Sequence, residues 1–193
     1  MKKIIIVIII ITSNINLFSQ NNFKNQAFEI GIESIDSFRD FLAIKNDANY
    51  KSEMEPLIQW GIDNFEEYGF LVERLETPEL PLLLATKIVS KEANTILIYL
   101  QFDGQPVDNS KWNQENPFIP VYKIKDNESF IDYDSNKIAD IDYKTLEDED
   151  IRIFARASSD AKGPVMMLIQ ALKFMNSNNC LLYTSPSPRD SLS

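Results

Sequence analysis

The segment Ile153-Phe-Ala-Arg-Ala-Ser-Ser-Asp-Ala-Lys-Gly-Pro164 decides the fold class, because it runs from an apolar strand through a polar loop into an apolar helix. Proline is favoured in the first turn of a helix, so the helix is predicted to begin near Gly163. The loop between strand and helix carries Asp160. Loops at the carboxyl ends of strands form the ligand sites of open α/β sheets. The segment therefore predicts an α/β protein with a site at Asp160.

An earlier segment has a similar order of apolar strand and acidic loop. Thr95-Ile-Leu-Ile-Tyr-Leu-Gln-Phe-Asp-Gly-Gln-Pro-Val-Asp108 places Asp103 directly after its apolar run. Two carboxylates at neighbouring strand ends repel each other unless a cation lies between them. A divalent metal would neutralise both charges and could polarise a carbonyl group or activate water. The two segments therefore predict a metal site that contains Asp103 and Asp160.

These motifs resemble the co-catalytic zinc metallopeptidase family of acetylornithine deacetylase, succinyl-diaminopimelate desuccinylase, carnosinase-type dipeptidases and glutamate carboxypeptidase. The family pattern is His-x-Asp-x-x-Pro-Val after a strand, a Trp with an Asp-Pro-Phe-like element, and Gly-Arg-Gly-x-x-Asp-x-Lys-Gly before a helix. The matching residues here are Gln101-Phe-Asp-Gly-Gln-Pro-Val107, Trp112 with Asn116-Pro-Phe118, and Ala155-Arg-Ala-Ser-Ser-Asp-Ala-Lys-Gly163. The order and chemistry agree between residues 25 and 177.

The resemblance implies roles for three residues. Asp160 would be the carboxylate that bridges two metal ions, zinc in the family, and Asp103 would orient the first metal ligand. Gln101 stands where the family has that ligand, a histidine, and the chain contains no histidine at all. An amide oxygen binds zinc more weakly than imidazole does and suits harder metals. Either the site holds a different or weaker metal, or one metal position is lost.

The resemblance also implies a fold and a reaction. The expected fold is the amino-terminal half of a three-layer α/β domain, with a mixed, mostly parallel sheet covered by helices on both faces. The expected activity is hydrolysis of an amide bond in a small peptide or an N-acyl amino acid. The family's general base and remaining ligands lie further along its sequence, so this chain alone is expected to be inactive. The alternative is a non-catalytic homologue that binds or scaffolds. A homodimer through a domain absent from this chain is compatible with either.

The chain departs from the family pattern at two further places. Ala155 and Ala157 replace glycines, and we expect ordinary backbone angles there. The acidic stretch Lys123 to Asp150 is additional, and it is expected to be a surface insertion. Its run Glu147 to Asp150 could bind a cation, but such runs are more often solvated loops.

The amino terminus has the pattern of a signal peptide. Lys2 and Lys3 precede an apolar run from Ile4 to Ile11, and Ser19 is the expected last residue before cleavage. This run is shorter than the ~20 residues needed to span a bilayer. Residues 1–19 are therefore expected to direct export to the periplasm or the medium, with no membrane attachment after cleavage. The alternative is an uncleaved membrane anchor.

The carboxyl terminus matches none of the expected elements. Cys180 to Asp190 has the sequence of a translated sequencing-library adapter, so residues 180–193 are treated as an artefact and residues 20–179 as the metallopeptidase part. The alternative is a natural Ser/Pro-rich tail. Cys180 is the only cysteine, which excludes an internal disulfide framework. The net charge of -10 disfavours binding to nucleic acid or anionic membranes.

Periodicity predicts the remaining elements. Expected helices cover residues 24–44, residues 52–68 with a capping box at Ser52 and Glu55, and the segment after Gly163, whose apolar residues predict burial on most sides. Trp60 is expected in the core. Expected strands are Phe70 to Leu75, Leu82 to Val89 and Thr95 to Leu100.

Structural alternatives exist for each residue of the proposed site. Asp160 could cap its helix, and Asp103 could be a turn aspartate. Arg156 could be a charge at a sheet edge and Lys162 a solvated charge, and no chemistry is assigned to either. Asp108 is expected to be structural.

Overall fold

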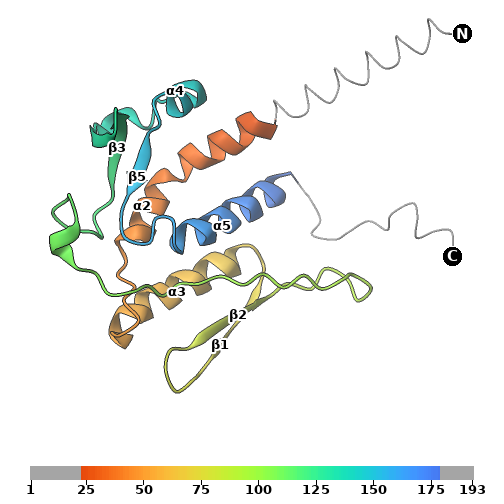
Figure 1. Ribbon diagram of the computed structural model, residues 1–193. Helices are drawn as coiled ribbons and strands as arrows, with labels where there is room; N and C mark the ends of the chain where they lie inside the picture. The colour runs from red at the N-terminus through yellow and green to blue at the C-terminus, as the bar shows by residue number, and fades with distance from the viewer. Residues whose placement is uncertain (1–22, 179–193) are drawn as a thin grey trace, which may run out of the picture.

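A computed structural model describes residues 23–178 as a mixed α/β structure (Figure 1). The predictions for residues 1–19 and 180–193 lie outside these described residues. In chain order the elements are a helix over residues 23–33, α2 (Ile35–Ala43), α3 (Lys51–Glu67), β1 (Leu71–Leu75), β2 (Leu82–Thr86), the 3-10 turn η1 (Asn109–Lys111), β3 (Val121–Asp126), β4 (Ser129–Tyr133), the 3-10 turn η2 (Ser135–Lys137), α4 (Tyr143–Asp148), β5 (Arg152–Phe154) and α5 (Lys162–Ser177).

The predicted helix over residues 24–44 is present, but it breaks at Ser34 into two helices. The Ser34 hydroxyl oxygen lies 2.6 Å from the carbonyl oxygen of Ile30 and 2.5 Å from Oε1 of Gln170 in α5. A serine hydroxyl that bonds to the carbonyl four residues earlier bends a helix. The helix is therefore interrupted at Ser34, which is buried and contacts Gln170 of α5.

The second predicted helix is confirmed as α3, but its expected capping box is wrong. The helix begins at Lys51, and its N-cap residue, Tyr50, makes no side-chain hydrogen bond. Glu55 instead forms an ion pair with Arg74 of β1, at 2.7 Å between Oε2 and Nη1. As predicted, the helix ends before Gly69, which has φ of 75° and so adopts the left-handed conformation that glycine tolerates best.

The expected mostly parallel, three-layer sheet is wrong. The named strands form two antiparallel sheets, one of β1 and β2 and the other in the order β4-β3-β5. Within the described residues the parallel contact is confined to one isolated bridge, between Asp47 and Gly104. β1 and β2 match the predicted strands, although β2 ends at Thr86. A short connection returns the chain antiparallel, whereas a parallel neighbour needs a long crossover.

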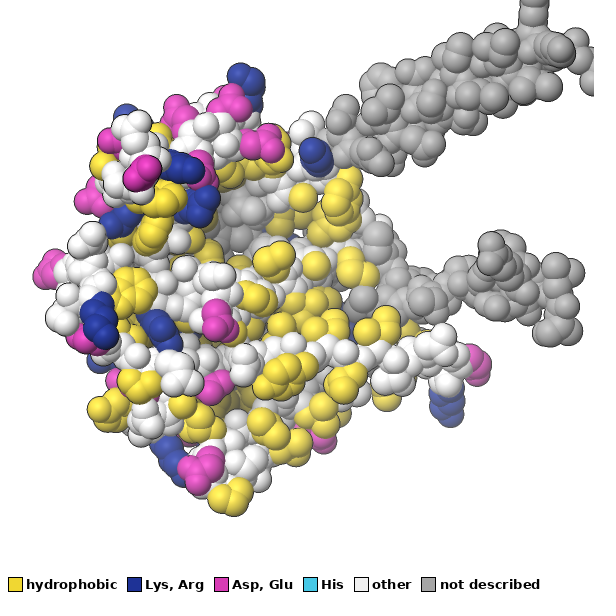
Figure 2. All heavy atoms as spheres, in the orientation of Figure 1, with side chains coloured by type: hydrophobic (Ala, Val, Ile, Leu, Met, Phe, Trp, Pro, Cys, Tyr) yellow, Lys and Arg dark blue, Asp and Glu magenta, His cyan; other side chains and the backbone are white. Residues whose placement is uncertain are grey.

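The predicted strand from Thr95 to Leu100 is not paired in the structure. Residues 95–99 are exposed, and only Leu100 is half-buried. Leu97 and Tyr99 are 86% and 79% exposed. Figure 2 shows hydrophobic side chains gathered across the middle and lower part of the view. The prediction of a strand here is therefore wrong: the run has the composition of a strand, but no partner within the described residues pairs with it.

The stretch from Lys123 to Asp150, predicted to be a surface insertion, is mostly exposed and forms a folded unit. It contributes β4, α4 and most of β3, and β3 pairs with β4 from Tyr122↔Tyr133 to Asp126↔Ser129. Its core is a buried cluster of Tyr122, Ile138, Ile141 and Ile151. Burial of these apolar side chains stabilises the unit and attaches it to the helix over residues 23–33, because Phe28 and Ile32 pack on the same cluster.

The main core lies where α5 passes between α2 and α3 (Figure 1). It contains Phe41, Met54, Leu57, Ile58, Val165 and Met166. Trp60 stacks on Phe41 with ring centroids 3.6 Å apart, which confirms its predicted place in the core. As predicted, α5 is buried on most sides, with Val165, Met166, Ile169 and Leu172 in the interior, although Met167 is 72% exposed. No helix within residues 23–178 is both long enough and apolar enough to cross a membrane.

Candidate functional site

The Asp103 loop is fixed by hydrogen bonds to the chain that follows α2. The amide of Gly104 donates to the carbonyl oxygen of Asn46 at 2.6 Å, and the amide of Ala48 donates to the carbonyl oxygen of Gly104 at 3.1 Å. Nδ2 of Asn46 donates to the carbonyl oxygen of Phe102 at 3.1 Å. These bonds hold the backbone on both sides of Asp103, while the side chains of Asp103 and Gln101 remain exposed.

Asn46 and Gly104 approach each other closely. Asn46 is 1% exposed, and a Cβ atom at residue 104 would lie 2.8 Å from its Nδ2. That distance is too short for two non-bonded atoms, so a larger residue at position 104 would displace the Asn46 amide, which bonds to Phe102. Asn46 was not predicted, because it lies in no motif and its partners are main-chain groups.

The Asp160 loop connects β5 to α5, as predicted. Asp160 is exposed, and the peptide bond that follows it is cis. The N-cap residue of α5 is Ala161, and no side chain caps the helix. The alternative that Asp160 is merely a helix cap is therefore wrong. Its side chain is exposed and does not cap α5.

The expectation of ordinary backbone angles at both alanines is wrong for Ala157. Its φ is 65°, in the left-handed region that glycine occupies with less strain than alanine. Its carbonyl oxygen accepts the amide of Lys162 at 3.0 Å, which closes the loop around Asp160. Gly163 is required by the same turn, because a Cβ there would lie 2.3 Å from the carbonyl oxygen of Ser158.

Arg156 connects the three motif segments. Its Nη2 donates to the carbonyl oxygen of Gln105 at 2.8 Å, and its amide donates to that of Pro117 at 2.7 Å. Pro117 is fully buried. The structure thus brings the loop after Asp103, the Pro-Phe element and the loop before Asp160 to one place. Sequence analysis left Arg156 without a role, although its position inside the second motif was a signal.

Lys162 is buried, so its interpretation as a solvated charge is wrong. It has no exposed surface, and its Nζ donates to the carbonyl oxygens of Phe41 at 2.8 Å, Leu42 at 3.4 Å and Ile44. Burial lowers the pKa of Lys162 to about 7. The three carbonyl oxygens oppose this shift, because they accept hydrogen bonds from the ammonium at the carboxyl end of α2.

The other acidic candidates have structural partners. Asp108 accepts hydrogen bonds from the amide and hydroxyl of Ser110 at 3.1 and 2.7 Å, which lower its pKa and confirm a structural role. In the run Glu147 to Asp150, Asp150 pairs with Arg152 at 2.7 Å. Within the part of the chain that the structure describes, no group of three or more Asp, Glu, His or Cys side chains is placed to hold a metal ion.

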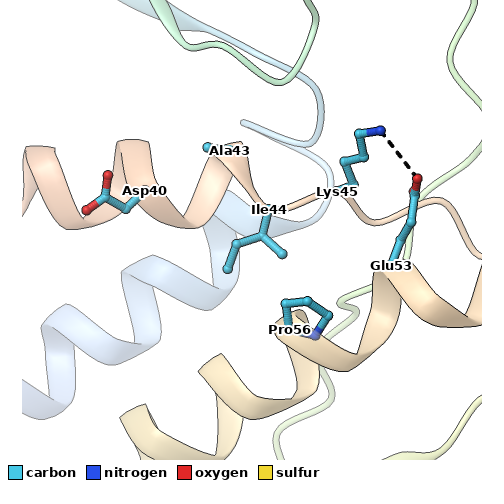
Figure 3. A pocket seen from close by; sticks show the side chains of 6 residues that line it. All are labelled: Asp40, Ala43, Ile44, Lys45, Glu53 and Pro56. Carbon is cyan, nitrogen blue, oxygen red and sulfur yellow. Dashed lines mark ion pairs between the residues drawn. The ribbon is translucent and has the colours of Figure 1, made fainter.

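An open hollow of about 390 Å³ lies between the end of α2 and the first turns of α3 (Figure 3). It is lined by Asp40, Ala43, Ile44, Lys45, Glu53 and Pro56. Lys45 and Glu53 face each other across it, with Nζ 3.6 Å from Oε1. None of the predicted metal ligands lines this hollow, so it is distinct from the Asp103 and Asp160 loops.

Comparisons with protein-family models, curated proteins and solved structures found no match for this chain.

Proposed function

We propose that this chain is the amino-terminal part of an exported, metal-dependent hydrolase of amide bonds, with a dipeptide, carboxyl-terminal residue or N-acyl amino acid as substrate. The observation that carries the proposal is the state of Asp160: its carboxylate is exposed and caps no helix. Arg156 supports it by linking the loop after Asp103 to the segment before Asp160.

The donor chemistry of the loops fits a hard divalent cation. Gln101, Asp103 and Asp160 offer only oxygen atoms, and oxygen donors suit such metals better than they suit zinc. In this proposal Asp160 holds the metal, Gln101 adds an amide oxygen and Asp103 orients the ligand beside it. When bound, a divalent metal would supply Lewis-acid polarisation of the scissile carbonyl and lower the pKa of a water molecule.

In this proposal the described residues outside the metal ligands hold the two loops in place. Arg156 and the main-chain bonds of Gly104 fix the backbone of the two loops that carry Asp103 and Asp160. In the family that the motifs resemble, the general base lies beyond the second motif. The 193-residue chain is therefore expected to lack amidase activity, and a chelator-sensitive activity in it would contradict this placement.

A second candidate function is a binding or scaffold protein without catalysis. The observation that favours it is Gln101, since loss of an imidazole ligand weakens a zinc site. The two functions differ in a complete gene: a downstream Glu-Glu pair and a terminal histidine would favour the hydrolase, and their absence would favour the binder.

The test is calorimetric titration of the untagged chain with Zn²⁺ and with Mn²⁺, for which weak binding is expected because the family's remaining ligands lie further along its sequence. Asp160→Ala should abolish binding while changing the free energy of unfolding by no more than about 0.5 kcal/mol, because the side chain caps nothing. Asp142→Ala is the matched control: Asp142 caps α4 by accepting the amide of Thr145 at 2.7 Å, so its loss should lower stability and leave metal binding unchanged. Unchanged metal binding in Asp160→Ala would contradict the proposal.

A further inference from the structure

We propose that residues 41–48, here called the connector, position the Asp103 loop and the Asp160 loop together, with Asn46 and Lys162 as the positioning residues. The connector comprises the last turn of α2 and the chain that leads toward α3. This inference rests on the proposed function, since it concerns how the two carboxylates of that site are held.

The Asp103 loop is bound by the second half of the connector. Asn46 contributes two of the contacts, by its side-chain amide to Phe102 and by its carbonyl oxygen to Gly104. Ala48 contributes the third through its amide. The residues on both sides of Asp103 are therefore fixed to a strand-like stretch of backbone 56 residues earlier in the chain.

The Asp160 loop is bound by the first half of the connector. Lys162 lies two residues after Asp160. Its ammonium group donates hydrogen bonds to the carbonyl oxygens of Phe41, Leu42 and Ile44. An ammonium group has three donors, so three acceptors satisfy it fully. These carbonyls lie in the last turn of α2 and just beyond it, where a cation is favoured, and that of Phe41 also accepts the amide of Ile44 at 3.3 Å. The ammonium also lies 5.1 Å from the centroid of the Phe41 ring.

The connector is suited to this role because its anchoring end is rigid. Phe41 and Leu42 have no exposed surface, and Phe41 is stacked on Trp60 of α3. Interiors packed this closely transmit small displacements instead of absorbing them. Loss of either set of contacts should therefore loosen both loops, although the side chains of Asn46 and Lys162 bond to different carbonyl groups and neither residue is a proposed metal ligand.

The first experiment measures amide hydrogen exchange in the full chain without metal. Lys162→Met removes the three donors and keeps a long apolar side chain. We expect exchange to accelerate about tenfold in residues 101–105, as well as in the loop that contains Asp160, with little change in α3. Lys173→Met is the control, because Lys173 lies on the same helix and forms an exposed ion pair with Glu33 at 3.1 Å.

The reciprocal experiment starts from the other loop. Asn46→Ala should accelerate exchange in residues 157–162 as well as in residues 101–105. Asn64→Ala is its control, since Nδ2 of Asn64 also donates to a main-chain carbonyl, that of Trp60, at 2.8 Å but within α3. If Lys162→Met does not fold, the Asn46→Ala experiment still tests whether the two loops are coupled. The coupling should persist in an Arg156→Met background, where the direct link to Gln105 is removed.

Metal titration of the same variants gives the second measurement. Lys162→Met and Asn46→Ala should each weaken Mn²⁺ binding about tenfold, whereas the two control variants should bind as the wild type does. Exchange that accelerates only in the loop next to each substitution would overturn the inference. If the wild type binds no metal but the exchange of the two loops is coupled, the proposed function fails and the connector stands.

Discussion

Nη2 of Arg156 lies 2.8 Å from the carbonyl oxygen of Gln105, a residue 51 positions earlier in the chain. Replacing Arg156 by Met keeps the apolar stem and removes the donor. A hydrogen bond from a charged group at a half-buried position contributes about 1 kcal/mol, so the free energy of unfolding should fall by that amount and metal affinity should fall with it. Urea denaturation and calorimetry measure the two quantities.

Arg152→Met provides the control for this arginine. Arg152 pairs with Asp150 on the surface of the second sheet, remote in sequence from Gln105. Its loss should change metal affinity by less than twofold, because exposed ion pairs contribute little. Equal losses of metal affinity in both variants would mean that Arg156 acts only through general stability.

The second prediction concerns the residue at the position of the family's histidine. Gln101→His should raise zinc affinity at least about tenfold, since an imidazole nitrogen is a stronger zinc ligand than an amide oxygen. The chain contains no histidine, so an untagged protein gives an unambiguous titration. Asn94→His, at an exposed position outside the motif loops, controls for adventitious binding. No gain over that control would remove Gln101 from the site.

The third prediction separates two glycines by the space around them. Gly163→Ala should lower the free energy of unfolding by about 1–3 kcal/mol, because its Cβ would lie 2.3 Å from a main-chain oxygen. Gly31→Ala should raise it by about 0.5–1 kcal/mol, because Gly31 is helical and nothing lies within 4 Å of its Cβ position. Thermal and urea unfolding of both variants would decide this, and similar effects of the same sign would contradict it.

The helices and their core were predictable because their signals are local. A helical period of apolar residues identifies α3 and α5 within a short window, and it also places Trp60 on the buried face. The break at Ser34 was not predictable in the same way. The bond from Ser34 to the carbonyl of Ile30 is local, but the contact of Ser34 with Gln170 joins residues 136 positions apart in sequence.

The sheets were predicted less well because strand pairing is not local. Apolar composition located β1 and β2, but the direction of pairing depends on the connection and on which partner is present. The β3–β4 hairpin had a signal that was missed: alternating residues flank Asn127, which adopts φ of 53° in the turn. The many acidic residues of that stretch led to its interpretation as a solvated insertion, so the alternation of apolar and polar residues was not used.

For the site, the sequence supplied the loops but not what holds them. Asp103 and Asp160 follow from the motifs, whereas Asn46, Arg156 and Lys162 act on main-chain carbonyl groups. Every residue has such a carbonyl, so no residue type marks the partner in the sequence. A lysine with no exposed surface is also contrary to the usual distribution of that residue.

The fourth prediction uses two neighbouring alanines with different backbone angles. Ala157→Gly should leave the free energy of unfolding within about 1 kcal/mol of the wild type, because relief of the φ of 65° offsets the lost methyl burial. Ala155→Gly loses a buried methyl group without such relief and should be the less stable variant. The reverse order of the two would contradict the strain assigned to Ala157.

The last prediction is a pH dependence at the N-cap of α4. The amide of Thr145 and, to a smaller extent, its side chain donate hydrogen bonds that lower the pKa of Asp142 below its ordinary value. A carboxyl whose pKa is lower in the folded chain stabilises it above the unfolded pKa, about 3.9, and this contribution is lost as the pH falls through the folded pKa. Asp142→Asn keeps an oxygen that can accept from Thr145 but cannot titrate. The stability advantage of the wild type over Asp142→Asn should therefore be larger at pH 7 than at pH 2. Urea unfolding of both proteins at the two pH values cancels the contributions of the other carboxylates, and an equal difference at both values would show that the charge of Asp142 contributes nothing to the cap.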